Sequence, residues 1–183
     1  MWDVATGKLL SQFTTKFVHD NPGYGTVFNV AFNPEGTLLA TGNGNGLVQF
    51  WDVAKNTEYK GMTGVVGRGQ GVAFSPDGKL FAASGYDSFS DANPMFDLRL
   101  WDLTTGKLVF KTESPGAGFI QVTFSPNSQI LASASYDSIL LWDIETGNTV
   151  ATLPGGESVA FSPDGTLIAI GYNDVRLWGI PAH

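Results

Sequence analysis

Apolar residues fall in short runs along this chain, and polar or glycine-containing stretches separate the runs. Within each run leucine, β-branched and aromatic residues predominate, and a helical period of 3.6 is not sustained anywhere. Such runs, bounded by turn residues, are typical of strands. We therefore predict an all-β chain with strands at 27–32, 37–41, 47–51, 71–74, 80–84, 98–101, 120–124, 130–133, 139–142, 158–161, 167–170 and 175–178.

A turn motif that begins with Phe recurs between the runs. Pro fixes φ early in such a turn, and Gly takes the positive φ that closes it. The motif therefore predicts a tight hairpin between the strand that ends at the Phe and the next strand. Its four copies read FNPEG at 32–36, FSPDG at 74–78, FSPNS at 124–128 and FSPDG at 161–165.

A second motif closes the third strand of each set with Trp, and a short turn follows it. The strands read LVQFWD ending at Asp52, LRLWD ending at Asp102, ILLWD ending at Asp143 and VRLWG ending at Gly179. The turns read ATGK at 5–8, TTGK at 104–107 and ETGN at 145–148. Self-similarity at a spacing of several tens of residues is the signature of a repeat architecture.

Together these motifs resemble those of the WD-repeat family over essentially the whole chain. The resemblance implies a β-propeller whose blades are four-stranded antiparallel sheets around a central channel. It implies that the Phe closes strand a and the Trp closes strand c. We therefore expect the following residues to be largely buried between blades: Trp51, Trp101, Trp142, Trp178, Phe32, Phe74, Phe124 and Phe161.

The chain departs from the family pattern because no repeat carries the Gly-His pair that often precedes strand a in the family. In the family that histidine bonds an acidic residue of the b–c turn, a Ser or Thr of strand b and the Trp. The residues here that correspond to the acidic position are Asp97, Asp137 and Asp174, with Asn45 in the first repeat. Without the histidine, we expect a shorter hydrogen-bonded network.

The repeat frame also predicts an assembly. The chain begins at the Trp-Asp position, so 8–13 is expected to be a strand d, and the last set stops after strand c. We interpret 1–183 as one domain of four blades, in which 8–13 completes the last blade within one chain or from a partner chain. A homodimer that closes an eight-bladed ring is favoured, since neighbouring blades then turn by about 45°. A four-bladed monomer and a segment cut from a longer array remain alternatives.

Charge and composition limit the classes of partner and cofactor that we expect for this chain. Seventeen acidic residues face ten basic ones, for a net charge of −7. Such a chain repels phosphates, so we expect no nucleic-acid partner. It has no cysteine and no apolar run long enough to span a bilayer. We therefore expect a cytoplasmic location, no membrane contact and no bound cofactor or metal.

The sequence offers little for catalysis. The acidic residues that turns do not account for are scattered over different loops, and His19 and His183 are the only histidines. The glycine-rich segment 42–46 contains no lysine and does not lead into a helix, as a phosphate loop would. We predict that the chain is not an enzyme. A hydrolase or lyase with a carboxylate site in the central funnel is the alternative from another class.

Two long insertions, at 14–26 and 86–97, should emerge on the same end of the propeller, because d–a and b–c connections share that end. Aromatic loops on a rigid scaffold are a common binding surface. We therefore predict a scaffold whose loop-rich face binds a protein or peptide through Phe17, His19, Tyr24, Tyr86, Phe89, Met95 and Phe96. Two alternatives stay open: the aromatic side chains cover their own loops, or the chain is a structural segment without a ligand.

Overall fold

The computed structural model describes residues 3–13, 26–44, 47–65, 68–87, 95–115 and 118–180. Within these ranges it describes the backbone throughout, and the side chains except those at 60–65, 68–70, 86–87, 95–96 and 113–115.

The described residues form fifteen strands in four antiparallel sheets, each of which we call a blade. Blade 1 contains β1 (Val27–Phe32), β2 (Leu38–Asn43), β3 (Leu47–Asp52) and β4 (Thr57–Val65). Blade 2 contains β5 (Arg68–Phe74), β6 (Leu80–Asp87), β7 (Met95–Asp102) and β8 (Leu108–Pro115). Blade 3 contains β9 (Gln121–Phe124), β10 (Ile130–Ala134), β11 (Ser138–Asp143) and β12 (Thr149–Pro154). Blade 4 contains β13 (Ser158–Phe161), β14 (Leu167–Gly171) and β15 (Val175–Gly179).

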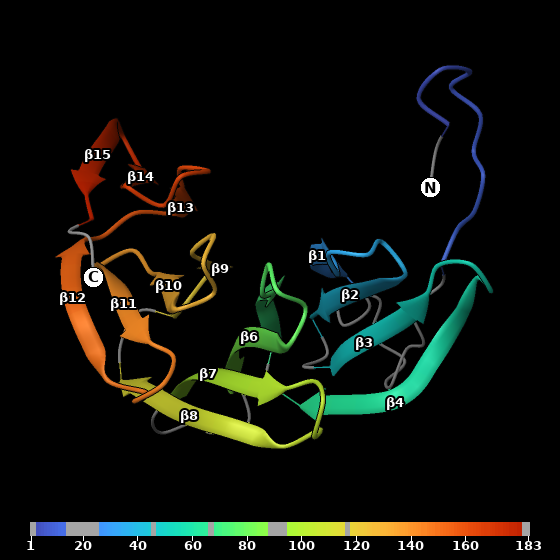
Figure 1. Cartoon of the computed structure of the whole chain (residues 1–183), viewed down its shortest axis with the longest axis horizontal. Coiled ribbons are helices and arrows are strands. Elements are labelled where there is room, and N and C mark those ends of the chain that lie inside the picture. Colours follow the sequence, from blue (N-terminus) through green and yellow to red (C-terminus); the bar gives the residue numbers. More distant parts are fainter. Residues whose placement is uncertain are drawn as a thin grey trace.

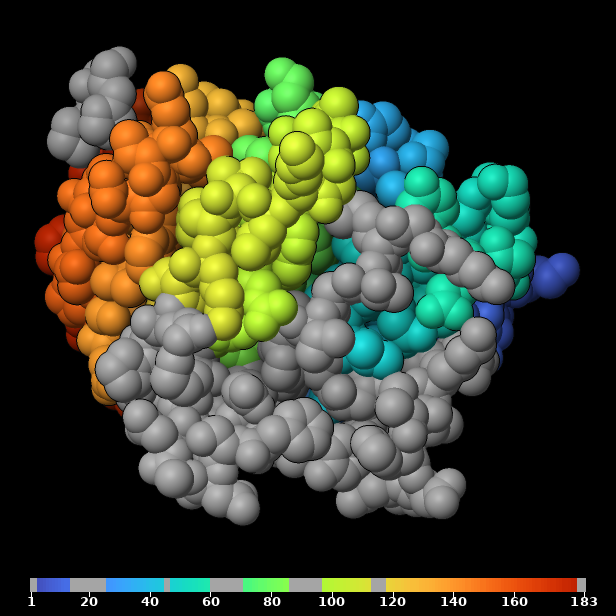
Figure 2. Space-filling view, turned by 90° about the horizontal axis from the view of Figure 1, so that it is seen from below, coloured from blue at the N-terminus to red at the C-terminus, as the bar shows by residue number. Residues whose placement is uncertain are grey.

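The blades stand side by side in an open arc (Figure 1). Within each blade neighbouring strands in sequence are neighbours in the sheet, and the fourth strands β4, β8 and β12 follow the convex outer side (Figures 1 and 2). The prediction of an all-β chain built from antiparallel blades is confirmed.

The predicted first strand, 8–13, is not formed in the single chain, and its pairing with the last blade stays a prediction. Only Leu9 makes a single bridge there, and the segment forms no strand. The reason is geometric: the N-terminal segment lies at one end of the arc, and β15, whose outer edge it was expected to cover, lies at the other end (Figure 1).

The a–b turns owe their shape to the Phe-x-Pro motif. In blade 2 the Ser75 hydroxyl donates to the Asp77 carboxylate at 2.6 Å and accepts the Leu80 amide at 2.9 Å. Gly78 then closes the turn with a φ of 72°. Blade 3 repeats this arrangement with Asn127 in place of the aspartate and Ser128 at the left-handed position, with a φ of 59°.

The core lies between blades, in three apolar clusters. Each blade from 2 to 4 turns a front face toward the blade before it, through the Val and Phe of strand a: Val72 and Phe74, Val122 and Phe124, Val159 and Phe161. Each blade from 1 to 3 turns a back face toward the next blade, through an Ala of strand b and two large residues of strand c: Ala40, Val48 and Phe50; Ala82, Leu98 and Leu100; Ala132, Ile139 and Leu141.

The expected burial of the motif aromatics holds inside the arc and fails at its ends. Trp51, Trp142, Phe74 and Phe124 are buried, and Trp101 and Phe161 are half-buried. Phe32 and Trp178 are exposed, contrary to the prediction. They belong to blades 1 and 4, where no neighbouring blade or fourth strand among the described residues covers them.

Candidate interaction surfaces

The predicted loop-rich face lies for the most part outside the described residues. Phe17, His19, Tyr24 and Phe89 all fall there, so their role stays a prediction. For Tyr86, Met95 and Phe96 the backbone is described, and it shows strand where the sequence predicted loop.

The hairpin of β6 and β7 is longer than the sequence predicts. Tyr86 is the Cα partner of Phe96, and Asp87 is the Cα partner of Met95. The two strands have eight residues each, whereas the second and third strands of the other blades have five or six. The turn-like composition of 86–97 hid this extension. Three of the predicted binding residues are therefore held on a regular ladder at the b–c end of blade 2.

A buried ion cluster lies just inside that hairpin. The Asp97 carboxylate pairs with the Arg99 guanidinium at 2.5 Å and with the Lys111 ammonium at 3.5 Å. Asp97 is almost fully buried, with its side chain 8% exposed. A carboxylate is costly to bury without partners. Arg99 on β7 and Lys111 on β8 supply the positive charge that compensates the buried Asp97 carboxylate.

Blade 1 carries a different polar chain, in which Gln49 stands at the register position of Arg99. The Asn43 amide donates to the Gln49 carbonyl oxygen at 2.8 Å, and the Gln49 amide donates to the Glu58 carboxylate at 3.1 Å. The b–c ends of both blades thus carry polar chains across the sheet, which sequence reasoning missed because the members come from different strands.

The Trp-centred network expected from the family is reduced to one hydrogen bond. The indole of Trp51 donates to the Thr41 hydroxyl at 3.3 Å, and that of Trp142 donates to the Ser133 hydroxyl at 2.8 Å. The register places Ala83 and Ile170 at this strand-b position in blades 2 and 4, so neither can accept such a bond.

The acidic residues expected in that network are engaged elsewhere or lie outside the description. Asp97 binds Arg99 and Lys111, and Asp174 binds Arg176 at 3.0 Å. Asp137 is exposed. Asn45 falls outside the described residues.

The aspartates in the turns are hydrogen-bond acceptors. Backbone amides of Thr105 and Thr104 lower the pKa of Asp102, and the Ser75 hydroxyl lowers the pKa of Asp77. The hydroxyl of Ser162, with the amide and hydroxyl of Thr166, lowers the pKa of Asp164 to about 2. A general acid needs a raised pKa, so these carboxyls serve the turns rather than proton transfer.

The described side chains offer no metal-binding group. Among residues 3–13, 26–44, 47–65, 68–87, 95–115 and 118–180, no three His, Asp or Glu side chains gather around one point. The same part of the chain contains no helix long and apolar enough to cross a bilayer.

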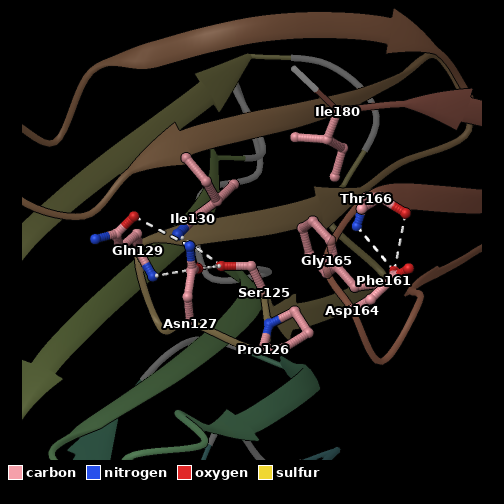
Figure 3. Close-up of a pocket in the computed structure, with 10 residues that line it drawn as sticks. All are labelled: Ser125, Pro126, Asn127, Gln129, Ile130, Phe161, Asp164, Gly165, Thr166 and Ile180. Carbon is pink, nitrogen blue, oxygen red and sulfur yellow. Dashed lines mark hydrogen bonds between the residues drawn. The ribbon is translucent and has the colours of Figure 1, made fainter. Parts of the chain in front are cut away.

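A pocket of about 450 Å³ opens on the other face, between the a–b turns of blades 3 and 4. Figure 3 shows Pro126 and Asn127 of blade 3 opposite Asp164 and Gly165 of blade 4, with Ile130 and Ile180 at its apolar side. The sequence placed the site on the opposite, loop-rich face and did not indicate this pocket.

Gly165 explains why the pocket forms at this junction. Between blades 2 and 3 the Ser128 hydroxyl accepts the Asp77 amide at 3.2 Å and bridges the two turns. Gly165 occupies the corresponding position in blade 4, and a Cβ built there would meet only the Pro126 ring, at 3.6 Å. A glycine where the preceding repeat has a serine is the sequence signal that could have found it.

Three relatives match most of this chain. It is 30% identical over 164 residues to the small ribosomal subunit protein RACK1y of Oryza sativa subsp. japonica, covering 81% of this chain and 45% of the rice protein. It is 28% identical over 166 residues to the small ribosomal subunit protein RACK1 of Neurospora crassa and to MST50-interacting protein 11 of Pyricularia oryzae, each covering 81% of this chain and 49% of the relative. The chain therefore spans about half the length of these relatives.

The repeats themselves match a described family. Residues 12–52, 59–89 and 106–143 each match the WD domain, G-beta repeat (WD40) family. These segments cover more than half of the chain, and blade 4 carries the same strand and turn motifs. The resemblance of the Phe-x-Pro and Trp-Asp motifs is thus confirmed, and the chain belongs to the WD-repeat family.

Proposed function

We propose that this chain is a scaffold that binds a protein or peptide partner through its loop-rich face. The family consists of non-enzymatic interaction modules, which bears out the prediction that the chain is not an enzyme and removes the hydrolase or lyase alternative. The observation that carries the proposal is the extended β6–β7 hairpin, in which Tyr86, Met95 and Phe96 are positions of one antiparallel ladder.

The names of the relatives support an interaction role. Two are small ribosomal subunit proteins and the third is an interacting protein, so each is named for its association with other macromolecules. We carry over to this chain only that general role. A cytoplasmic location is part of the proposal, and the absence of cysteine is compatible with a reducing compartment.

The assembly that presents this face is also proposed. We take 1–183 as one domain and propose that two copies close an eight-bladed ring. Ring closure would fix the b–c ends of all blades in one plane, which favours binding because less conformational freedom is lost.

Selection from a random peptide library against the purified chain tests the binding face. Residues 88–94 are replaced by Asn-Gly, which joins β6 to β7 through a two-residue turn, and Tyr86, Met95 and Phe96 are each replaced by Thr. We expect the selected peptides to bind this variant at least tenfold more weakly, while the melting temperature stays nearly unchanged.

Gln129→Ala is the control on the opposite face, because Gln129 lines the pocket between the a–b turns. Binding lost on Gln129→Ala and kept after loop replacement would place the site in that pocket. A selection that yields no binder would favour the alternative of a structural segment without a ligand.

A further inference from the structure

Each pair of neighbouring blades brings two a–b turns side by side, and side chains close these junctions in different ways. Between blades 1 and 2, Glu35 reaches over the next turn, since a Cβ built on Gly78 would lie 3.1 Å from the Glu35 Oε1. Between blades 2 and 3, the Ser128 hydroxyl accepts the Asp77 amide at 3.2 Å. Both junctions therefore contain a side chain that crosses from one turn to the other.

The junction of blades 3 and 4 lacks both of these crossing contacts among the described side chains. Asn127 stands at the position of Glu35, but its amide donates to the Gln129 side chain of its own turn at 3.0 Å. Gly165 stands at the position of Ser128 and has no side chain to offer. The pocket of about 450 Å³ is the space that these two residues leave open.

Apolar side chains form one side of this pocket. Ile130 is buried, Phe161 and Ile180 are half-buried, and all three line the pocket together with the ring of Pro126 (Figure 3). The volume lies within the range of pockets that hold small ligands. The methylene stem of an arginine or lysine packs well against such a surface while its charged head stays near water.

The carboxylate of Asp164 is the charged group of the pocket. The hydrogen bonds that it accepts from described residues come from the Ser162 hydroxyl and from the amide and hydroxyl of Thr166, and all of them end on Oδ1. The second oxygen, Oδ2, is therefore available to a ligand. Because these bonds lower the pKa of Asp164 to about 2, the carboxyl is negatively charged at neutral pH.

Blade 2 shows which kind of group this position attracts. Asp77 is the equivalent of Asp164, and the ammonium of Lys79 lies 3.6 Å from the Asp77 carboxylate. Blade 4 carries Thr166 at the position of Lys79, and the residues that line the pocket include no Lys, Arg or His. The negative charge that blade 2 compensates within its own turn is thus left, in blade 4, to a cation from outside.

Hydrogen-bond acceptors stand on both walls of the pocket. Asp164 belongs to the blade 4 wall, and Gln129, whose side-chain oxygen accepts a single bond from Asn127, belongs to the blade 3 wall (Figure 3). A guanidinium carries five donors in one plane, whereas an ammonium is a compact point charge. The pocket therefore suits arginine better than lysine.

A second hollow continues the acidic surface beside the first. This pocket of about 370 Å³ shares Gln129 and Ile130 with the first pocket and is also lined by Asp143 and Glu145. Its lining residues include no basic side chain either. A segment that extends from the first pocket into the second would therefore be favoured by further positive charge.

We propose that the pocket between the a–b turns of blades 3 and 4 binds an arginine side chain of a protein or peptide partner. The guanidinium lies between Asp164 and Gln129, and the methylene stem packs on the apolar side of the pocket. This surface lies opposite the loop-rich face, so it is a second interaction site beyond the function proposed above. The net charge of −7 attracts a basic partner from a distance.

Heteronuclear NMR of the isotope-labelled chain tests the site with a defined probe. The probe is the tripeptide acetyl-Ala-Arg-Ala-amide, and its matched control carries citrulline, which has the shape of arginine without the charge. We expect the arginine peptide to shift the amide signals of Asn127, Gly165 and Thr166 until they saturate. The citrulline peptide should bind about fivefold to tenfold more weakly.

Two variants remove the available charge in different ways. Asp164→Asn keeps the turn, because Asn127 forms the same turn in blade 3. Thr166→Lys supplies the cation that Lys79 supplies in blade 2. Each variant should bind the arginine peptide only as weakly as the parent binds the citrulline peptide. Asp77→Asn is the matched control, since it makes the same change in blade 2 and should leave the affinity unchanged.

Equal affinities for the arginine and citrulline peptides would overturn the proposal, as would signals that do not shift at millimolar peptide or that shift on another face. An Asp77→Asn variant that binds as weakly as Asp164→Asn would also overturn it, because the peptide would then respond only to net charge. The amide spectrum of each variant shows whether it folds. The replacement of residues 88–94 should leave the tripeptide affinity unchanged, so a failure of this site is distinguishable from a failure of the loop-rich face.

Discussion

The indole nitrogen of Trp142 donates a hydrogen bond of 2.8 Å to the hydroxyl of Ser133, and both side chains are buried. The two residues lie on adjacent strands, β11 and β10, two positions out of direct register. A buried donor is costly to leave without an acceptor. This one bond therefore does in blade 3 what a longer network does in repeats that carry a histidine.

Ser133→Ala should lower the free energy of unfolding by about 1–2 kcal/mol, because it leaves the Trp142 N–H buried without an acceptor. Chemical denaturation with tryptophan fluorescence measures the change. Ser84→Ala is the comparison, because the Ser84 hydroxyl accepts a backbone amide, that of Gly71, at 3.1 Å. Only Ser133→Ala should also shift the Trp142 emission, and an unshifted spectrum would contradict the assigned bond.

The strands inside the arc were predictable because their signals are local. Each Phe-x-Pro turn places a Ser or Asn side chain and a left-handed residue so that the next strand must reverse. Each Trp-Asp step places a carboxylate to cap the c–d turn. These bonds involve residues at most five positions apart, so the sequence alone contains both partners.

The ends of the arc were not predictable in the same way. Phe32 has the same local motif as Phe74, yet its burial depends on a neighbouring blade. Residues 8–13 have the composition of a fourth strand, but a strand requires an edge to pair with. The candidate site was only partly predictable for the same reason. The spacing of the motifs predicted a long connection at the b–c end of blade 2. The ladder that reaches Met95 and the ion cluster at Asp97 depend on pairing between strands, which no local motif encodes.

Ser128 offers a test of turn strain. It is a serine at a φ of 59°, where the equivalent residues Gly36, Gly78 and Gly165 are glycines. A non-glycine residue at a left-handed position costs about 1 kcal/mol. The exposed hydrogen bond from the Asp77 amide to the Ser128 hydroxyl stabilises the fold by less than this cost.

Ser128→Gly should therefore raise the melting temperature by one to a few degrees, an order of magnitude set by the size of the domain. Calorimetry of the variant and the parent measures the shift. Ser128→Ala keeps the strain and removes the hydroxyl, so it should lower the melting temperature. A fall with Ser128→Gly would show that the link between blades 2 and 3 outweighs the strain.

Acid stability should depend on Asp164. Hydrogen bonds from Ser162 and Thr166 hold the pKa of Asp164 at about 2 in the folded chain, below its ordinary value of 3.8. A carboxyl with a lowered folded pKa stabilises the fold above its unfolded pKa, and this stabilisation is lost as the pH falls through the folded value. The contribution is thus complete above about pH 5 and disappears between about pH 4 and 2.

Asp164→Asn is a conservative test because blade 3 carries Asn127 at the same position and forms the same turn. We expect the variant to melt below the parent at pH 6 and the difference to shrink toward zero at pH 2. Thermal scans by circular dichroism at several pH values measure it. A difference that is constant over this range would mean that the carboxylate charge contributes nothing.

The two Asp-x-Arg pairs should differ in their contribution to stability, although their sequences and registers agree. Asp97 is buried with Arg99 and Lys111, whereas Asp174 and Arg176 are exposed. Removing one partner of a buried pair leaves desolvated charges uncompensated, and exposed pairs contribute about 0–1 kcal/mol. Asp97→Asn should therefore lower the free energy of unfolding by about 1–3 kcal/mol, and Asp174→Asn by less than about 1 kcal/mol.

Urea denaturation monitored by circular dichroism gives the two free energies. Equal losses of unfolding free energy for Asp97→Asn and Asp174→Asn would show that burial does not set what each pair contributes.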